Sequence, residues 1–371
     1  MKLKRFSVQN FKNFKNKYTL DFSDVKEYTF SHACIDNNLI KNAIIYGKNS
    51  VGKTNLGLAM FDITYHLIDK MKSDKMYSSY LNAHASYDES AEFSYCFLTD
   101  DGREIEYNYK KTSVFFLSQE ELIIEGKRVF FYDYVKGEGD FSNIEKNGLS
   151  TLNWEFKDSN ISILRYMANN IPLSKNHPIK ELFEFINGML WFCSFGSGDN
   201  RYIGLLMNID YINDFIIRNG FVKDYEKFLN EYGVDEKIVS KINPDGTKSL
   251  FFQYDNLIPF TMASSGTNAL TTLYYWYKQV DKVSFLFIDE FDAFYHYELA
   301  EKIVKLLEDK VKCQTILTSH NTALMTNKIM RPDCYFILTR DRLVSLSNAT
   351  HRELREGHNL ERLYMGGEFD E

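Results

Sequence analysis

Cysteine and proline are both scarce in this chain, which has five of each among its 371 residues. The cysteines are scattered, their number is odd, and no Cys-x-x-Cys pair occurs. This usage argues against a disulfide framework or a zinc site and favours a reducing cytoplasm. No low-complexity run and no linker rich in proline or serine interrupts the chain. We therefore expect a cytoplasmic protein that is folded over most of its length.

Long apolar runs and an excess of positive charge are also missing. No apolar run approaches the ~18 residues that a membrane-spanning helix needs. The N-terminal sequence MKLKRFSVQN lacks the apolar core of a signal peptide. The net charge is −7, so the chain as a whole is not expected to bind polyanions. We expect no association with a membrane.

Basic residues do gather at the N-terminus, where the first 20 residues contain no acid. This strip is either a solvated strand face or a contact with the phosphates of a nucleotide or nucleic acid. The sequence alone leaves both interpretations open. The basic residues of the strip are Lys2, Lys4, Arg5, Lys12, Lys15 and Lys17.

Aromatic residues, in contrast, are abundant, with 30 Phe and 25 Tyr. The hydrophobic content of 44% and the charged content of 26% are typical of a chain that buries a large core. The length is enough for roughly two domains of ordinary size.

One local pattern is more informative than the composition. Residues 47–54 read Gly-Lys-Asn-Ser-Val-Gly-Lys-Thr, a complete G-x-x-x-x-G-K-[ST] phosphate-binding loop. An apolar stretch that ends at Tyr46 predicts a strand before the loop, and apolar residues at helical spacing predict a helix after it. A glycine-rich turn that arose by chance is the alternative, but it would not require these flanks. The apolar positions after the loop are Leu56, Met60, Ile63 and Leu67.

Each residue type in this loop has a chemical role. Gly47 and Gly52 allow backbone N–H groups to curl around a phosphate, and the start of a helix adds partial positive charge. Lys53 can reach the β- and γ-phosphates, and Thr54 can place its hydroxyl on Mg²⁺. The residues that we expect to contact the nucleotide are Gly47, Lys48, Asn49, Ser50, Val51, Gly52, Lys53, Thr54 and Asn55.

A second element of such a site follows much later in the chain. Residues 285–290 read Phe-Leu-Phe-Ile-Asp-Glu, an apolar run that suits a parallel strand buried on both faces. Two carboxylates at its end lie where open α/β sheets bind their ligands. Asp289 would hold Mg²⁺, directly or through water, and Glu290 would polarise the attacking water. Without the phosphate loop, a solvated strand end would explain the pattern equally well.

Residues 314–320 form a similar short strand that ends in Thr-Ser-His. We expect His320 to hydrogen-bond the γ-phosphate or the attacking water. The alternative is a capping serine and a surface histidine at the start of a helix near residues 322–325. Residues 263–267, Ala-Ser-Ser-Gly-Thr, precede a helical pattern and predict another anion site, or a plain helix cap.

The rest of the pattern predicts an α/β fold. Residues 2–9 and 17–22 read as strands, and residues 91–134 alternate as in an antiparallel sheet of roughly three to five strands. Residues 158–240 show helical periodicity, which includes Leu190, and strand and helix alternate after about residue 247. We therefore predict an N-terminal lobe over 1–134, a mainly helical insertion over 135–245 and a C-terminal lobe over 246–371.

The order of these motifs resembles that of ABC-class ATPases, in the branch that contains RecF, the SMC heads and the OLD-type ATPases. The tail resembles that of stand-alone AAA-type ATPases from anti-phage defence systems, of the RloA/AbiL type. Residues 263–267 depart from the Leu-Ser-Gly-Gly-Gln signature of the class, and the alignment favours Ser264 as the phosphate contact. The matching segments are LKRFSVQNFKNFKN, GKNSVGKT (Walker A), ASSGT (signature), FLFIDE (Walker B), Asp292 (D-loop), TSH (His switch) and GHNLERLYMGGEFDE.

This resemblance implies an ABC-type P-loop NTPase head with a mixed, mainly parallel core sheet, an antiparallel β subdomain and a helical insertion. It implies that ATP and Mg²⁺ are the ligands and that Lys12 and Asn13 also contact the nucleotide. It further implies a homodimer in which Ser264 and Gly266 complete the partner's site. Gln119 is a candidate for the Q-loop glutamine.

The resemblance also suggests a biological role. In the defence ATPases an ATP switch controls an effector, and the residues after His320 contain no plausible nuclease centre, even around His351 and His358. We therefore expect a separate nuclease or toxin chain as effector, with nucleic acid or a phage protein as a possible trigger. The alternatives are a RecF-like DNA-repair ATPase and, less favoured, the ATPase subunit of a transporter.

Overall fold

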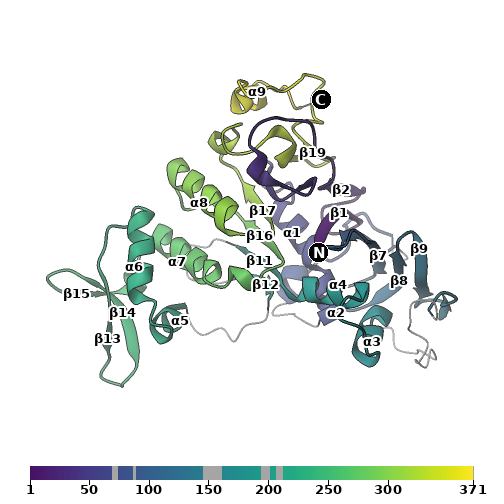
Figure 1. The fold of residues 1–371 in the computed structure, drawn as a ribbon, viewed down its shortest axis with the longest axis horizontal. Coiled ribbons are helices and arrows are strands. Elements are labelled where there is room, and N and C mark those ends of the chain that lie inside the picture. The colour runs from purple at the N-terminus through teal and green to yellow at the C-terminus, as the bar shows by residue number, and fades with distance from the viewer. Residues whose placement is uncertain (69–73, 87–88, 145–160, 194–200, 206–211, 371) are drawn as a thin grey trace.

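The computed structural model describes residues 1–68, 74–86, 89–144, 161–193, 201–205 and 212–370. These residues form three lobes around a central sheet, with the C-terminal residues in the upper lobe (Figure 1). Within the part of the chain described, no helix combines the length and the apolar character that are needed to cross a membrane.

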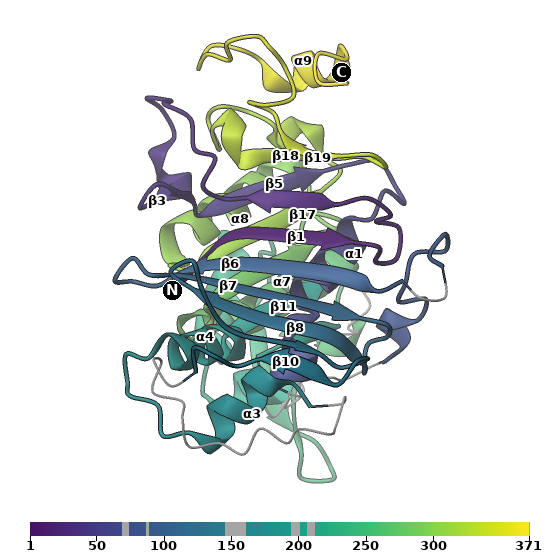
Figure 2. The same cartoon turned by 90° about the vertical axis from the view of Figure 1, so that its right-hand side faces the viewer.

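The N-terminal lobe contains a seven-stranded sheet in the order β10-β9-β8-β7-β6-β1-β2. All of its strand pairs are antiparallel, which confirms the antiparallel sheet predicted from the alternation (Figure 2). The sheet buries one face of aromatic side chains, such as Tyr95 and Tyr107. Its strands are β1 (Lys2–Gln9), β2 (Tyr18–Asp21), β6 (Ala91–Leu98), β7 (Glu104–Lys111), β8 (Leu117–Ile124), β9 (Lys127–Asp133) and β10 (Glu138–Asp140).

A second seven-stranded sheet, in the order β12-β11-β16-β17-β5-β18-β19, forms the core of the molecule. Its five inner strands run parallel, and only the two edge strands are antiparallel. The predicted α/β fold with a mainly parallel core is therefore confirmed. The strands are β5 (Asn42–Tyr46), β11 (Met189–Cys193), β12 (Tyr202–Gly204), β16 (Phe285–Asp289), β17 (Gln314–Ser319), β18 (Tyr335–Leu338) and β19 (Leu343–Ser345).

Helix α1 (Lys53–Phe61) lies between the two sheets. On one side, an added Cβ on its Gly57 would lie 2.6 Å from the Nε1 atom of Trp191, in the core sheet. On the other side, the hydroxyl of Tyr95 in the antiparallel sheet donates to the carbonyl of Ala59, at 3.0 Å. The two sheets therefore fix the helix that follows the phosphate loop.

A third lobe projects to the left in Figure 1 and carries the three-stranded sheet β13-β14-β15 beside α5, α6 and α7. The strands are β13 (Ile238–Ile242), β14 (Lys248–Gln253) and β15 (Leu257–Pro259). A short hairpin pairs β3 (Ile35–Asp36) with β4 (Leu39–Ile40). The helices after α1 are α2 (Ile63–Ile68), α3 (Ile163–Asn170), α4 (Pro178–Asn187), α5 (Ile212–Arg218), α6 (Val222–Glu231), α7 (Ser265–Tyr277), α8 (Tyr297–Lys310) and α9 (Leu360–Met365).

The range 135–245 differs from the expected helical insertion. Helices α3 to α6 do lie in it, but β11 lies there too and pairs with β16 in the middle of the core sheet. Leu190, which the periodicity assigned to a helix, is a β11 residue. A short apolar run after a helix gives the same signal for another helical turn as for a buried strand, so periodicity could not separate them. The exact lobe boundaries remain predictions.

Candidate nucleotide-binding site

Three neighbouring parallel strands bring the predicted motifs together. Strand β17 pairs with β16 on one side and with β5 on the other. The strands end at Tyr46, Asp289 and Ser319, so the residues that follow them meet at one edge of the sheet. This edge is where open α/β sheets bind ligands.

The phosphate loop lies at this edge and has the shape of an anion cradle. Gly52 has φ +109° and Ser50 has φ +64°, so the loop uses left-handed backbone twice. A Cβ on Gly52 would lie 2.3 Å from the side-chain nitrogen of Asn13, which explains the need for glycine. Within the described chain, the backbone N–H groups of residues 48–52 donate no hydrogen bond. Unpaired N–H groups at the start of a nine-residue helix fit a phosphate group.

Lys53 begins helix α1, and its side chain is folded back over the loop. Its Nζ donates to the carbonyl of Gly47 at 2.8 Å and to Nε2 of His320 at 2.7 Å. Burial lowers the pKa of Lys53, while the charge of Asp289 opposes this shift. The structure therefore places the phosphate loop and the Thr-Ser-His segment in direct contact.

Asp289 ends β16 and is 1% exposed. Its two carboxylate oxygens accept hydrogen bonds from Thr54 at 2.6 Å and from Thr318 at 2.7 Å. Burial raises the pKa of Asp289, and both threonine hydroxyls counteract this rise. Thr54 and Asp289 thus lie together as the pair that would hold Mg²⁺, which usually takes only one or two protein ligands beside substrate phosphates and waters.

Glu290 follows directly, with φ +49° in the left-handed region, which is uncommon for a residue with a side chain. Its backbone N–H donates to the hydroxyl of Thr318 at 2.8 Å. This turn of the backbone takes Glu290 out of the strand direction, and its side chain is only half-buried. The expected base therefore lies at the open edge of the sheet.

The Thr-Ser-His segment contacts Lys53 of the phosphate loop and the residues at the end of β16. Thr318 binds Asp289, Ser319 donates to the carboxylate of Asp292 at 2.6 Å, and His320 accepts from Lys53. Burial raises the pKa of Asp292, and the hydrogen bond from Ser319 opposes that rise. The expected helix after this segment is only one 3₁₀ turn, Thr322–Leu324, capped by Asn321. The sequence predicted a role for His320 but missed those of Thr318 and Ser319.

Asn13 and Lys12 differ in their relation to the loop. The side-chain nitrogen of Asn13 donates to the carbonyl of Val51 at 2.8 Å, and its oxygen accepts from Asn55 at 2.6 Å. The Nζ of Lys12, in contrast, donates to the carbonyl of Ser78 at 2.9 Å. Asn13 and Asn55 therefore stabilise the loop through side-chain hydrogen bonds, whereas the side chain of Lys12 is directed to Ser78.

Ser264 and Gly266 lie at the start of α7, where Ser264 is the N-cap and accepts from the N–H of Thr267 at 3.2 Å. A Cβ on Gly266 would lie 3.3 Å from the carbonyl of Phe294. Among the described contacts, none joins Ser264 or Gly266 to residues 47–54. Ser264 is exposed, and Gly266 is half-buried beside Phe294, two residues after Asp292 in the chain.

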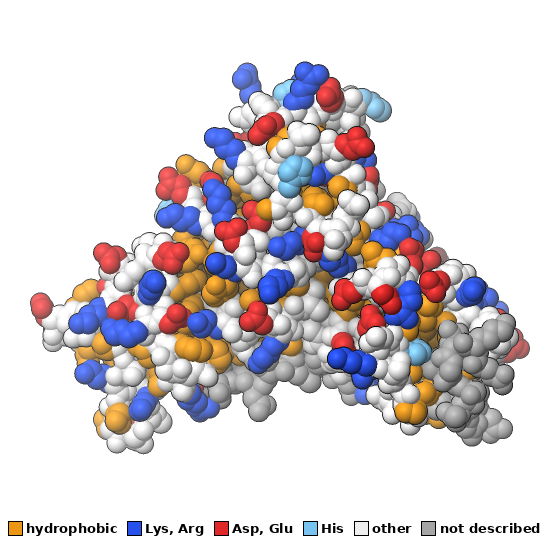
Figure 3. Space-filling view, viewed as in Figure 1, with side chains coloured by type: hydrophobic (Ala, Val, Ile, Leu, Met, Phe, Trp, Pro, Cys, Tyr) orange, Lys and Arg blue, Asp and Glu red, His pale blue; other side chains and the backbone are white. Residues whose placement is uncertain are grey.

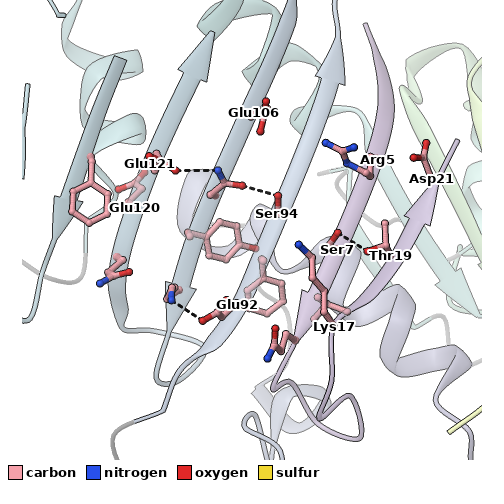
Figure 4. Close-up of a pocket in the computed structure, with 18 residues that line it drawn as sticks. Arg5, Ser7, Lys17, Thr19, Asp21, Glu92, Ser94, Glu106, Glu120 and Glu121 are labelled. Carbon is pink, nitrogen blue, oxygen red and sulfur yellow. Dashed lines mark hydrogen bonds and ion pairs between the residues drawn. The ribbon is translucent and has the colours of Figure 1, made fainter. Parts of the chain in front are cut away.

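Gln119, the Q-loop candidate, lies in the antiparallel sheet, where its side chain donates to Asp133 at 2.9 Å. It lines a groove of about 710 Å³ on the outer face of that sheet (Figure 4). The floor of the groove carries hydrogen-bonded polar pairs, such as Ser7 with Thr19 and Ser94 with Asn108. Among the described contacts, none joins Gln119 to residues 47–54, so its role as the Q-loop glutamine stays a prediction.

Two of the six basic residues of the N-terminal strip pair with acids. Lys2 lies 2.5 Å from Asp36, and Lys4 lies 2.7 Å from Glu104. Figure 3 likewise shows Lys and Arg side chains interspersed with Asp and Glu over one face of the molecule. These pairs favour the interpretation of the strip as a solvated strand face.

The mainly parallel sheet and the phosphate loop together define the class of P-loop α/β proteins. Residues 43–326 match the AAA_21 family, described as "AAA domain, putative AbiEii toxin, Type IV TA system". This range covers well over half of the chain, which therefore belongs to the AAA_21 family. A search of the curated proteins found no match.

Several solved structures align with most of this chain at low identity. The SMC head domain from Thermotoga maritima is 14% identical, with a TM-score of 0.45 over 93% of this chain and 98% of that chain. The Smc head domain bound to the C-terminal domain of ScpA, derived from Pyrococcus furiosus, is 15% identical, with a TM-score of 0.48 over 94% of this chain and 97% of that chain. The recombination mediator protein RecF-ATPrS is 13% identical, with a TM-score of 0.39 over 93% of this chain and 98% of that chain.

Proposed function

We infer that the chain binds ATP with Mg²⁺ and hydrolyses it. The observation that carries this inference is the meeting of Lys53, Thr54, Asp289 and His320 at one sheet edge, joined by hydrogen bonds of 2.6 and 2.7 Å. Family membership supports the same reaction class. When bound, ATP and Mg²⁺ supply the phosphoanhydride and the charge that neutralises its oxygens.

Different residues of the site bind the phosphates, hold the metal and activate the water. The N–H groups of the loop hold the phosphates, because they are unpaired donors at the start of a helix. Lys53 holds them as well, because it is a cation. Thr54 and Asp289 supply the oxygen atoms for the metal. Glu290, at the open end of the strand, accepts the proton of the attacking water. His320 can contact the terminal phosphate from the neighbouring strand.

We further propose that ATP closes a homodimer. Ser264 and Gly266 lie at the exposed start of a helix and do not touch the loop of their own chain. A head-to-tail pair of chains would place these residues on the partner's site, which gives two equivalent sites on a twofold axis. ATP would then act as a ligand of the closed state, and hydrolysis would open it.

The proposed biological role is the control of an effector in prokaryotic anti-phage defence. The support is the toxin–antitoxin description of the family and the similarity of the tail to defence ATPases. The effector would be a separate nuclease or toxin chain, so the purified chain alone should not degrade DNA or RNA. Degradation that depends on Mg²⁺ and is lost in His358→Ala would contradict this two-chain scheme.

The nucleotide site is tested by Lys53→Ala and Asp289→Ala. Lys53→Ala should weaken ATP binding by about 10- to 100-fold, since it removes a charged donor to the phosphates. Asp289→Ala should lose hydrolysis that depends on Mg²⁺. Calorimetry and phosphate release measure these effects, and normal turnover by either variant would refute the site.

The dimer is tested with Glu290→Gln, which should retain ATP while it loses the base. Light scattering should then show a dimer with ATP and a smaller species without it. An equal mass under both conditions would exclude an ATP-driven dimer. A mixture of Lys53→Ala and Gly266→Trp chains should leave at most one of two composite sites intact.

A further inference from the structure

Thr318 occupies the centre of the candidate site without being one of its expected ligands. It lies in β17 and is 0% exposed. Its hydroxyl donates to Oδ1 of Asp289 at 2.7 Å and accepts from the N–H of Glu290 at 2.8 Å. Its carbonyl accepts from the N–H of Phe291 at 3.2 Å. Thr318 is therefore hydrogen-bonded to three consecutive residues, 289–291, at the end of the neighbouring strand β16.

These contacts fix Asp289 through its carboxylate and Glu290 through its backbone. The bond to Asp289 orients the carboxylate, so that Oδ2 is left for Thr54, at 2.6 Å. The bond to Glu290 holds its N–H, where the backbone turns to φ +49°. Such left-handed residues persist only when surrounding contacts hold them. A threonine suits this role because its branched Cβ restricts the side chain to few rotamers in a strand.

We propose that Thr318 is the positioning residue that sets the metal-binding geometry of Asp289 and the backbone turn of Glu290. This inference rests on the proposed nucleotide site, but it concerns Thr318, a residue to which the motifs gave no role of its own. It acts through Asp289 and Glu290 and does not itself contact nucleotide or metal.

The test compares three variants of the full-length chain. Thr318→Val keeps the shape and removes the hydroxyl, and Thr318→Ser keeps the hydroxyl. Thr315→Val makes the same change in the same strand, at a buried residue whose hydroxyl donates to the carbonyl of Cys313 at 3.4 Å. The affinity for a slowly hydrolysed ATP analogue is measured by calorimetry with Mg²⁺ and with EDTA, and hydrolysis is measured separately.

The ratio of the two affinities reports how well the metal is held. Thr318→Val should reduce the gain in affinity from Mg²⁺ by about tenfold, because the carboxylate of Asp289 loses the hydrogen bond that orients it. The affinity in EDTA should stay unchanged. Thr318→Ser should restore most of the gain, and Thr315→Val should match the wild type. The rate of hydrolysis should fall in Thr318→Val by at least the same factor.

The outcomes separate this inference from the proposed function. A wild-type chain that binds no nucleotide would refute the function and, with it, the inference. A wild-type chain that gains affinity from Mg²⁺, beside a Thr318→Val chain with the same gain, would refute the inference alone. If Thr318→Val lost stability and Thr318→Ser recovered the melting temperature but not the gain from Mg²⁺, the role of Thr318 would be structural only, which also refutes the inference.

Discussion

The Nζ of Lys53 lies 2.7 Å from Nε2 of His320, and it also donates to the carbonyl of Gly47. The lysine expected to bind phosphate is thus already paired inside the protein. Partial desolvation, followed by the charge of Lys53, lowers the pKa of His320, which keeps the imidazole neutral as an acceptor. We expect a nucleotide that binds Lys53 to compete with this hydrogen bond.

This relationship predicts that His320→Ala binds ADP more tightly than the wild type does. The substitution removes a competitor for Lys53, and ADP has no γ-phosphate contact to lose. We expect a gain of about three- to tenfold, the worth of one hydrogen bond, in a calorimetric titration. ATP should gain less, because the imidazole contact to the γ-phosphate is lost, and hydrolysis should slow.

His320→Gln is the matched control, since its amide oxygen can still accept from Lys53. Its affinity for ADP should stay close to that of the wild type. Unchanged ADP affinity in His320→Ala would show that the Lys53–His320 hydrogen bond does not compete with nucleotide.

Much of the fold could be predicted because its signals are local. The strand that ends at Tyr46, the loop and the start of α1 follow from glycine spacing and apolar periodicity within one short segment. The same holds for the buried run that ends at Asp289. Strand β11 could not be predicted in this way, because its pairing with β16 is set by the tertiary fold and not by its own pattern.

The contacts within the site show the same limit. The sequence placed Asp289 and His320 at strand ends, but it could not show that Thr318 binds Asp289 from the next strand. Likewise, the Asn-Phe-Lys start suggested that both Lys12 and Asn13 face the nucleotide. The backbone of Lys12 has φ +48°, and its side chain leads to Ser78, a direction that no sequence pattern encodes.

A buried ion pair at the end of α1 leads to a prediction about stability. Lys111 lies 2.8 Å from Asp62, and both side chains are 0% exposed. The carboxylate also accepts from the hydroxyls of Tyr80 and Tyr109, at 2.9 and 3.0 Å. Lys111→Met should lower the free energy of unfolding by about 3–5 kcal/mol, because it leaves a buried carboxylate without its cation.

Urea denaturation of the nucleotide-free chain measures this loss. The double variant Asp62→Leu with Lys111→Met is the control, since it removes both charges. It should be more stable than Lys111→Met alone, because no unpaired charge is buried. If the double variant is the less stable of the two, the pair does not explain the effect.

Gly57 in α1 gives a prediction that opposes helix propensity. Alanine is normally favoured over glycine within a helix by about 1 kcal/mol. Here, however, the new Cβ would lie 2.6 Å from Nε1 of Trp191 and 2.9 Å from the ring of Phe287. Gly57→Ala should therefore destabilise the protein by about 1–3 kcal/mol, as measured by urea denaturation.

The partner substitution tests the cause. Nε1 of Trp191 is buried and has no hydrogen-bond partner among the described residues, so Trp191→Phe removes this crowding atom without breaking a described hydrogen bond. Gly57→Ala should cost less in the Trp191→Phe background than in the wild type. Equal costs in both backgrounds would exclude the contact with Trp191 as the reason.

His66 predicts how stability depends on pH. Its Nε2 lies 2.9 Å from the hydroxyl of Tyr107. Burial, followed by the charge of Lys111, lowers the pKa of His66 well below its usual value of 6.5. In the unfolded chain the ring takes up a proton near pH 6.5, whereas in the folded chain it stays neutral. Stability is therefore full above this pH and is lost as the pH falls below it, by about 1.4 kcal/mol per pH unit.

His66→Phe keeps an aromatic ring beside Tyr107 and Tyr109 but cannot take up a proton. Urea denaturation of both proteins between about pH 7.5 and 5 isolates the contribution of His66, because all other titrating groups are shared. As the pH falls, the free energy of unfolding of the wild type should decrease relative to that of His66→Phe. The slope of this difference against pH should correspond to about one proton. Parallel curves over this range would show that His66 is protonated equally in the folded and unfolded chains.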